Sequence, residues 1–427
     1  MNAGLAVLAN LAGLGGPALQ PGTLFNPLLD RPPLAPGEIL AGPYGLLFFL
    51  PLIPPLLLVA RHFPRAALVL VGFAWAVLTL RLETTLVLLG WLTIATAWVL
   101  LLASLRRREW LSRRAMIGLI WVGVHALVLP LWWNAQQSWY PSRMAALHNV
   151  GFSYFLLRLV AWGVDLANTP QSSPRLADTI CWLLYPPCMR LGPILRQQEF
   201  SSRLVAWRPP SLALWREGAK RIGLFLLGGV GLALVGRHIP DVDFFATPEE
   251  YHTSVLIKAF YLVPIQIYLL LWTYNELAVA ASCWVGIRVD DNFRRLPLAT
   301  SVRDFWHRWH VTVGAWLRDY IYVPLGGNRR HVSLNIIAVF AYCGLWHGAS
   351  WSFLAWGLSQ AAALIVQRGW DHLRARLGWE GRPGGRLWTV LCWLLTMHYQ
   401  VATIVIFADF DHLGGRLLRE LVRRLAN

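Results

Sequence analysis

The sequence predicts an all-α polytopic membrane protein, and two observations carry this prediction. Hydrophobic residues make up 56% of the chain and charged residues only 14%, with a mean hydropathy of +0.47, whereas a soluble domain has about 25% charged residues. Apolar runs of membrane-spanning length recur along the whole chain, without the short alternating segments of a transmembrane β-barrel. We therefore expect the chain to cross the membrane as helices.

The first third of the chain contains four predicted spans. They cover residues 43–60, 66–80, 84–104 and 115–133. The loop 105–114 is rich in arginine and is predicted to be cytoplasmic, because basic loops stay on that side of the membrane. Counting back along the spans places 61–65 in the cytoplasm and the N-terminus outside. Residues 1–42, rich in Gly, Pro and Leu, are given no span.

The rest of the chain continues in the same way. Further apolar segments lie near 147–164, 176–195, 222–236, 254–274 and 387–408, and the block 332–367 has no charged residue and is long enough for about two crossings. We expect roughly 10–11 transmembrane helices in total, with additional re-entrant or interfacial helices.

The predicted sidedness contains one conflict. The acidic segment 241–252 is predicted to lie outside and the basic tail 416–424 in the cytoplasm, yet simple alternation of the spans puts the tail outside. One segment, either 275–287 or part of 332–367, is therefore expected to be re-entrant or to be miscounted as a span. Irregular backbone at membrane depth requires protein or a water cavity around it, so the count indicates a cavity in the C-terminal half.

The net charge of +16 has two possible explanations. A nucleic-acid-binding protein can carry such a charge, but here the basic residues cluster between apolar runs, as the positive-inside rule expects. We therefore expect the lipid bilayer as a partner and no nucleic acid. The five cysteines lie in apolar surroundings without a C-x-x-C pair, so neither a disulfide nor a metal site is expected.

Residues 301–330 are aromatic and polar and do not form a clean span. Their apolar positions fall at helical spacing, which predicts an amphipathic helix at the membrane interface: Trp306, Trp309, Val313, Trp316 and Leu317. His307 and His310 would share one face of this helix. Either histidine could be functional, or an interfacial aromatic with a polar tip. Asp319 could act on a substrate or pair with Arg318 or Arg329.

His347 lies in the charge-free block 332–367. An ionisable group in a membrane segment is costly and usually faces the protein interior or water. Two explanations remain open, a neutral imidazole bonded to a neighbouring helix or a general base. Burial disfavours the charged form, and a neutral imidazole can take a proton from a hydroxyl. The flanking residues are small or aromatic and suit a passage: Gly344, Gly348, Ala349, Trp346 and Trp351.

Other catalytic motifs are absent from the sequence. It has no Gly-x-Ser-x-Gly elbow, no P-loop and no dinucleotide-binding fingerprint. Acid–base chemistry by histidine therefore fits better than a covalent serine route.

The segments that contain His310 and His347 resemble a known family. "DFWHRWHVTVGAWLRDYIYVPLGGNRR" (304–330) followed by "LWHGASWSFLAWG" (345–357) is similar to the signature region of the membrane-bound O-acyltransferases. "WLRDYIYVPLGGNR" resembles the alginate O-acetyltransferase branch in particular. Upstream, 149–168, 185–200 and 273–293 are similar to further segments of the family.

The resemblance implies a many-helix fold around a central funnel. It divides the chain into N-terminal transmembrane helices with a variable N-terminal segment (1–144), an acyltransferase core (145–408) and a basic tail (409–427). It implies that His347 and His310 are catalytic, and that Trp346, Trp309, Asp319 and Arg318 bind substrate. His307 stands where the family commonly has Arg and is not expected to be catalytic.

The implied reaction moves an acyl group, typically acetyl, from a cytoplasmic thioester across a bacterial inner membrane. The acceptor would be a hydroxyl of an exported polysaccharide or a relay protein such as a periplasmic acyltransferase. The donor would be acetyl-coenzyme A or another acyl thioester, used as a co-substrate, with no bound cofactor. Two other functions stay open, a glycan-lipid transporter or flippase and a non-catalytic scaffold of an export complex.

Overall fold

The computed structural model describes nine stretches of the chain: residues 43–80, 82–136, 152–171, 174–189, 192–239, 247–348, 351–379, 385–408 and 415–426. These residues form helices and connecting loops, and no strand occurs among them. The prediction of an all-α protein is confirmed. The predictions for residues 1–42, and for most of the loop after the fourth span, fall outside the described residues.

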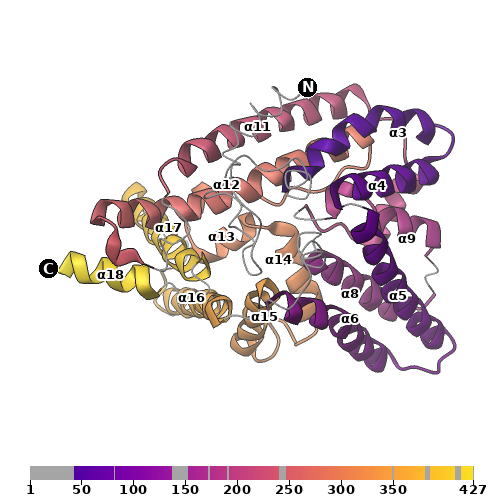
Figure 1. Cartoon of the computed structure of the whole chain (residues 1–427). Coiled ribbons are helices and arrows are strands. Elements are labelled where there is room, and N and C mark those ends of the chain that lie inside the picture. Colours follow the sequence, from indigo (N-terminus) through magenta and orange to yellow (C-terminus); the bar gives the residue numbers. More distant parts are fainter. Residues whose placement is uncertain are drawn as a thin grey trace.

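The N-terminal helices coincide with the predicted spans. They are η2 (Pro43–Leu52), α3 (Ile53–Ala60), α4 (Pro64–Leu80), α5 (Leu82–Arg107) and α6 (Arg113–Gln136). α5 and α6 pack beside α8 (Phe152–Asn168), at the right-hand side of Figure 1. Their buried faces join one large apolar core with helices from the C-terminal half of the chain.

The segment predicted as a span near 176–195 is mostly not helical. α9 (Leu176–Leu183) stops before two prolines, which cannot continue a helix. The chain then passes through η3 (Pro186–Cys188) to α10 (Gln197–Val205). The buried guanidinium of Arg158 donates hydrogen bonds to the carbonyls of Trp182 and Cys188 in this stretch. These bonds satisfy backbone groups that a regular helix would have paired internally.

α11 (Leu212–Gly236) and α12 (Thr253–Val285) form a long pair that runs along one side of the molecule (Figure 1). α12 is continuous through residues 275–285, so the prediction that this part could be a re-entrant segment is wrong. Many large apolar side chains of α11 are exposed, including Leu227 and Leu234. Such a surface is expected where a helix faces lipid.

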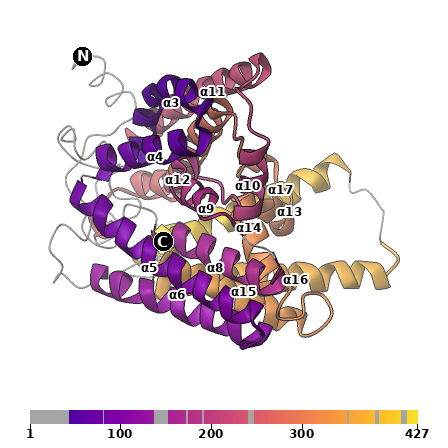
Figure 2. The ribbon, with the colours of Figure 1, turned by 90° about the vertical axis from the view of Figure 1, so that its right-hand side faces the viewer.

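The centre of the molecule holds two short helices (Figures 1 and 2). α13 (Val302–Arg308) and α14 (Val311–Leu317) are followed by the π-helical turn η7 (Arg318–Tyr322). The prediction of one amphipathic helix through 301–317 is therefore wrong, because the helix breaks at Trp309 and His310. The charge-free block becomes α15 (Val332–His347) and the start of α16 (Trp351–Arg376), and α17 (Arg386–Ala408) follows the last predicted span.

The chain is a multi-pass membrane protein. Among the described residues, four helices are long and apolar enough to cross a membrane, namely Thr85–Arg107, Leu212–Gly236, Thr253–Val285 and Arg386–Phe407. Three shorter apolar helices add to these, Gly45–Ala60, Pro64–Leu80 and Val332–His347. The figure of roughly ten or eleven crossings stays a prediction.

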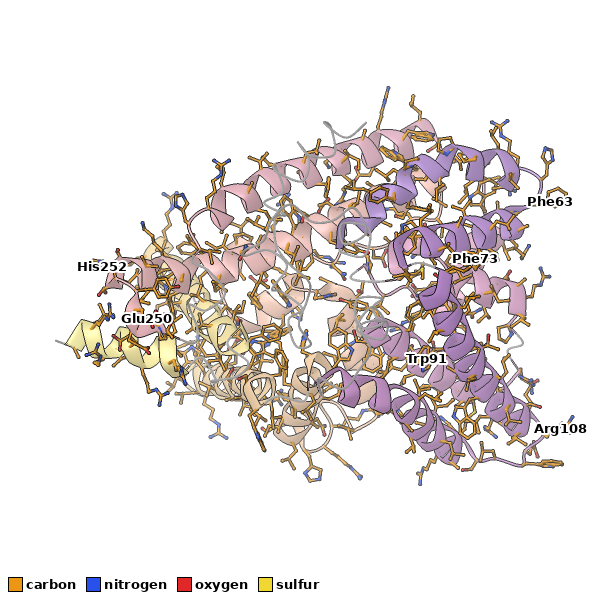
Figure 3. All side chains as sticks on the ribbon, in the orientation of Figure 1. Phe63, Phe73, Trp91, Arg108, Glu250 and His252 are labelled. Carbon is orange, nitrogen blue, oxygen red and sulfur yellow. The ribbon has the colours of Figure 1, made fainter. Side chains whose placement is uncertain are left out.

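Loops that are predicted to lie on opposite sides of the membrane are found at opposite ends of the molecule. Phe63 and Arg108, in loops predicted to be cytoplasmic, lie at one end, and Glu250 and His252 lie at the other (Figure 3). The basic tail forms α18 (Gly415–Ala426), and its Arg424 donates hydrogen bonds to the carbonyls of Glu249 and Tyr251. The predictions of an exterior 241–252 segment and a cytoplasmic tail are therefore incompatible with each other.

Candidate active site

His310 lies at the break between α13 and α14. It adopts left-handed backbone angles, φ 45° and ψ 52°, which cost a non-glycine residue about 1–2 kcal/mol. Hydrogen bonds on both sides hold this conformation. The Arg294 N–H donates to the Arg308 carbonyl at 3.0 Å, and the Val311 N–H donates to the Asn292 carbonyl at 2.9 Å.

The buried side chain of Asn292 strengthens this clamp. Its Oδ1 accepts hydrogen bonds from the Thr312 backbone N–H at 3.1 Å and from the Thr312 hydroxyl at 2.6 Å. The Thr312 hydroxyl in turn accepts the Ile194 N–H at 2.9 Å. Thr312, two positions after His310, is thereby connected to the irregular stretch before α10.

The His310 ring is buried and polar on both edges. Its Nε2 lies 2.8 Å from the hydroxyl of Tyr154, and its Nδ1 has no hydrogen-bond partner among the described residues. Burial without an acidic partner lowers the pKa of His310 to about 4, so the ring is neutral at pH 7. A buried nitrogen without a partner is uncommon and is typical of a functional site.

His347 is the last residue of α15. Two glycines bring α15 and α16 into direct backbone contact: a Cβ on Gly344 would lie 2.2 Å from the Phe353 carbonyl oxygen, and a Cβ on Gly357 would lie 2.2 Å from that of Phe340. This close packing holds the C-terminal end of α15, where His347 lies, against α16. Gly344, which was predicted from the sequence to suit a passage, therefore allows close contact between two helices.

Aromatic rings surround the His347 imidazole. The ring centroids of Phe407 and Trp356 lie 4.9 Å and 5.6 Å away, both edge-on, and that of Phe353 lies at 6.1 Å. Among the described residues no hydrogen bond is made by either ring nitrogen of His347. The indole Nε1 of Trp356 is also buried without a partner in this part of the structure.

The first turn of α8 joins the two histidines. The Tyr154 ring lies 6.1 Å from His310 and 5.5 Å from Trp346, and Trp346 lies 4.8 Å from His347. The Trp346 indole N–H donates to the Ser153 carbonyl at 3.2 Å. The structure thus brings together His310, His347 and Trp346, three of the six residues predicted for the site.

The other three predicted residues have different surroundings. Trp309 stacks on Phe305, with centroids 5.6 Å apart, and packs edge-on against Phe293 at 5.3 Å. The ring centroid of Phe293 also lies 5.8 Å from that of His310. Phe293 therefore lies between Trp309 and the His310 ring.

Arg318 and Asp319 form ion pairs on η7. The Arg318 Nε donates to Asp319 at 2.6 Å, and Arg196 donates to the same carboxylate. Partial burial opposes the charge of Asp319, but the two guanidiniums outweigh it and hold the pKa of this carboxyl below its usual value. The salt-bridge explanation weighed from the sequence therefore accounts for both residues. Their roles in substrate binding stay predictions.

Sequence reasoning missed Tyr154 and misplaced Trp351. Tyr154 lies inside a segment that resembles the family, but a lone tyrosine 156 positions before His310 gives no signal of their contact. Trp351, predicted to line a passage, is 78% exposed on the outside of α16. Glu276, which carries no role in the sequence prediction, pairs with Arg221 at 2.9 Å.

The arrangement suits acid–base chemistry on an uncharged substrate group. A neutral imidazole in an aromatic environment can accept a proton, and nearby unpaired polar atoms can stabilise an oxygen that gains charge. Among the described residues no group of three His, Cys, Asp or Glu could hold a metal ion. The polar groups of the site are the two imidazoles, the Tyr154 hydroxyl and the indole N–H of Trp356.

Comparison with known proteins identifies the family. The family model described as "MBOAT, membrane-bound O-acyltransferase family" matches residues 125–408. The chain is 27% identical over 231 residues to a probable alginate O-acetylase of Azotobacter vinelandii, covering 51% of this chain and 44% of that protein. It is 35% identical over 248 residues to a peptidoglycan O-acetyltransferase of Helicobacter pylori, covering 55% and 45%.

A third relative differs in its reaction. The chain is 25% identical over 350 residues to a teichoic acid D-alanyltransferase of Bacillus subtilis, covering 75% of this chain and 86% of that protein. The chain spans about half the length of the alginate and peptidoglycan relatives. The named relatives therefore share an acyl group as their cargo and differ in the acceptor.

Proposed function

We propose that this chain, which belongs to the membrane-bound O-acyltransferase family and to its alginate O-acetyltransferase-like branch, transfers an acetyl group from a thioester donor to a hydroxyl. The observation that supports the proposal best is the convergence of His310 and His347 through Tyr154 and Trp346. A transporter or a scaffold has no need for two imidazoles held together in this way.

The proposed reaction uses His347 as the general base. His347 takes the proton of the acceptor hydroxyl while the oxygen attacks the thioester carbonyl carbon. The former carbonyl oxygen of the tetrahedral intermediate becomes negative. In the proposal, an N–H at the Nδ1 of His310 and the indole N–H of Trp356 stabilise it. The C–S bond then breaks, and the departing sulfur takes the proton from His347. The products are an acetyl ester and a free thiol, and the imidazole is neutral again.

The donor and acceptor that we propose are those that the family resemblance implies. We propose acetyl-coenzyme A or another acyl thioester at the cytoplasmic face of a bacterial inner membrane as the donor, acting as a co-substrate. The acceptor is an exported polysaccharide, or a periplasmic acyltransferase that completes the transfer. The relatives named for alginate and peptidoglycan support a glycan acceptor. We further propose an exterior N-terminus.

The test measures transfer of labelled acetyl from acetyl-coenzyme A in membranes that hold this protein and its native partners. We expect wild type to transfer label and His347→Ala to lose it at equal expression. His398→Ala is the matched control, because His398 is an exposed histidine of α17 that bonds only to Tyr261 and the Leu394 carbonyl among described residues. Full activity of His347→Ala would contradict the mechanism, and no transfer by wild type with any thioester would favour a transporter or scaffold.

A further inference from the structure

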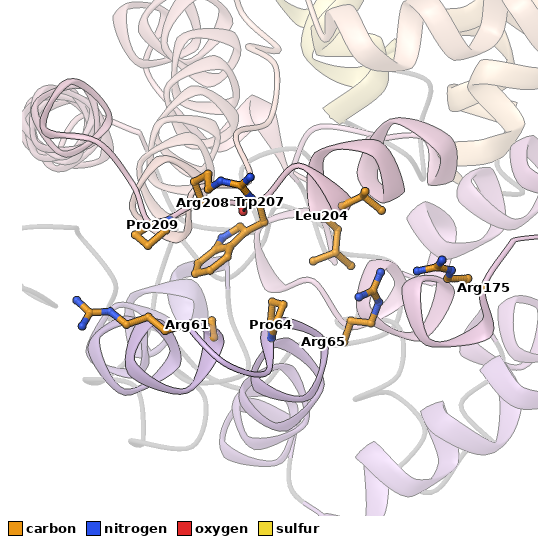
Figure 4. A pocket seen from close by; sticks show the side chains of 10 residues that line it. Arg61, Pro64, Arg65, Arg175, Leu204, Trp207, Arg208 and Pro209 are labelled. Carbon is orange, nitrogen blue, oxygen red and sulfur yellow. Dashed lines mark hydrogen bonds between the residues drawn. The ribbon is translucent and has the colours of Figure 1, made fainter.

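A second site lies away from the histidines, on the surface between the α3–α4 loop and α10. It is a cavity of about 420 Å³, within the range of about 300–1,000 Å³ typical of small-molecule sites. Four arginines line it, namely Arg61, Arg65, Arg175 and Arg208, and Figure 4 shows them together with the indole of Trp207. Neither the proposed reaction nor the family motifs account for this cluster.

The positive charge of the cavity is largely uncompensated. Among the described residues Asp178 is the one carboxylate that pairs with these arginines, through the Nε of Arg65. Arg61 and Arg175 are exposed and have no such partner in this part of the chain, and Arg208 donates only to the Trp207 carbonyl. Guanidiniums gathered without acidic partners favour binding of an anion, and their planar forks fit phosphate oxygens.

Trp207 adds a fixed aromatic surface to this charge. Its indole N–H donates to the Val285 carbonyl at 2.9 Å, which holds the ring in place at the end of α12. In Figure 4 the ring lies toward Arg61 and Arg208, while Arg65 and Arg175 lie toward the other side of the cavity. This order suits an elongated ligand with an aromatic group at one end and phosphates at the other.

α10 connects the cavity with the candidate active site. Leu204, near the end of α10, lines the cavity, and Ile194, just before α10, bonds to Thr312 beside His310. Two extended residues and seven helical residues lie between Ile194 and Leu204, which limits the distance between their Cα atoms to about 20 Å. A flexible thioester arm attached to a ligand in the cavity would have to cover a distance of this order.

We propose that this cavity binds the phosphate groups of a nucleotide-type acyl donor, with the base stacked on Trp207 and the arm directed along α10. This proposal rests on the proposed function, because it names the site that binds the phosphates of the acyl donor. The same phosphate chemistry exists in the headgroups of anionic phospholipids. The aromatic surface and the connection to His310 favour the nucleotide.

The experiment uses the purified full chain in nanodiscs of neutral phosphatidylcholine, with adenosine 3′,5′-bisphosphate as the probe. We expect wild type to bind the probe, and the double variant Arg61→Gln with Arg175→Gln to raise its dissociation constant about tenfold or more, as for the loss of charge-assisted hydrogen bonds. The control double variant Arg114→Gln with Arg329→Gln removes the same charge from exposed arginines elsewhere and is expected to bind as wild type does.

Three results would overturn the proposal. Wild type could fail to bind the bisphosphate, or both double variants could weaken binding equally. Native mass spectrometry could also show phosphatidylglycerol retained through Arg61 and Arg175 by a protein that ignores the bisphosphate, which would assign the cavity to lipid.

Failure of the cavity proposal can be told apart from failure of the proposed function. His347→Ala should bind the bisphosphate as wild type does, because binding requires no chemistry. Acetyl transfer without bisphosphate binding would remove the cavity proposal alone. Binding without transfer by wild type would support the phosphate site and contradict the acetyltransferase.

Discussion

The two histidines of the candidate active site are held in opposite ways. His310 is 8% exposed, and its neighbours Arg308 and Val311 form backbone hydrogen bonds with Arg294 and Asn292; one of its ring nitrogens is bonded to Tyr154. His347 lies at the end of a helix and is surrounded by the rings of Phe353, Trp356 and Phe407. It is partly exposed.

This difference separates their expected roles. Hydrogen bonds fix both the position and the orientation of a ring, which suits a group that must present one edge to a developing charge. Apolar rings fix the position of an imidazole and leave its nitrogens available, which suits a base that exchanges a proton with substrate. On this basis we expect proton transfer by His347 and orientation or charge stabilisation by His310.

The largest expected effect is that of His347→Gln. Glutamine keeps a polar side chain of similar length but cannot accept a proton at neutral pH, so acetyl transfer should fall about 10²–10⁴-fold. Initial rates at saturating donor measure this loss. Thermal unfolding in detergent serves as a control, because aromatic packing alone is expected to keep the variant folded.

His310→Gln should lose less. If His310 supplies a hydrogen bond to a charged intermediate, its removal costs about 1.5–3 kcal/mol, or roughly 10–100-fold in rate. The unfolding temperature should also fall, because the Tyr154 hydroxyl is left buried without its partner. A loss equal to that of His347→Gln, with no change in stability, would break the comparison between the two histidines.

Tyr154→Phe tests whether the hydrogen bond to Tyr154 orients the His310 ring. The variant removes only the hydroxyl at 2.8 Å from Nε2, so the rate should fall about 2–10-fold. The effect should be nearly absent when His310 is already Gln, because the hydroxyl then has no imidazole to orient. Additive losses in the double mutant would mean that Tyr154 acts independently of His310.

Gly344→Ala tests the packing that positions His347. The added Cβ would lie 2.2 Å from the Phe353 carbonyl oxygen, so α15 and α16 must separate, at a cost of about 1–3 kcal/mol. Thermal unfolding should show this loss, and transfer should fall only a few-fold. Gly369→Ala, on the packing partner α16 with open space around the new Cβ, is the control and should leave transfer unchanged without lowering stability.

Asp319→Asn should have the smallest effect. The carboxylate is partly exposed and its partners are Arg318 and Arg196, so the change in stability should stay within about 1 kcal/mol. The Michaelis constant for the donor should change less than twofold. A large increase in that constant would show that Asp319 contacts substrate, as the family resemblance implies.

The sequence by itself determined the helices and one of the two histidines. Apolar runs predicted the spans because a helix in lipid must present apolar side chains along its whole length, and these runs coincide with α4, α5, α6 and α17. His347 stood out because an ionisable residue in a charge-free block is costly unless it has a function or a partner. Its place in a family motif supplied its expected role.

The tertiary structure decided the surroundings of His310. The period of the apolar residues predicted one helix through 301–317, but hydrogen bonds from residues 292–294 break that helix and turn the His310 ring toward Tyr154. These partners come from distant parts of the chain, and local spacing carries no information about them. The same reason hid the arginine cavity, since its residues lie in three separate segments that only folding brings together.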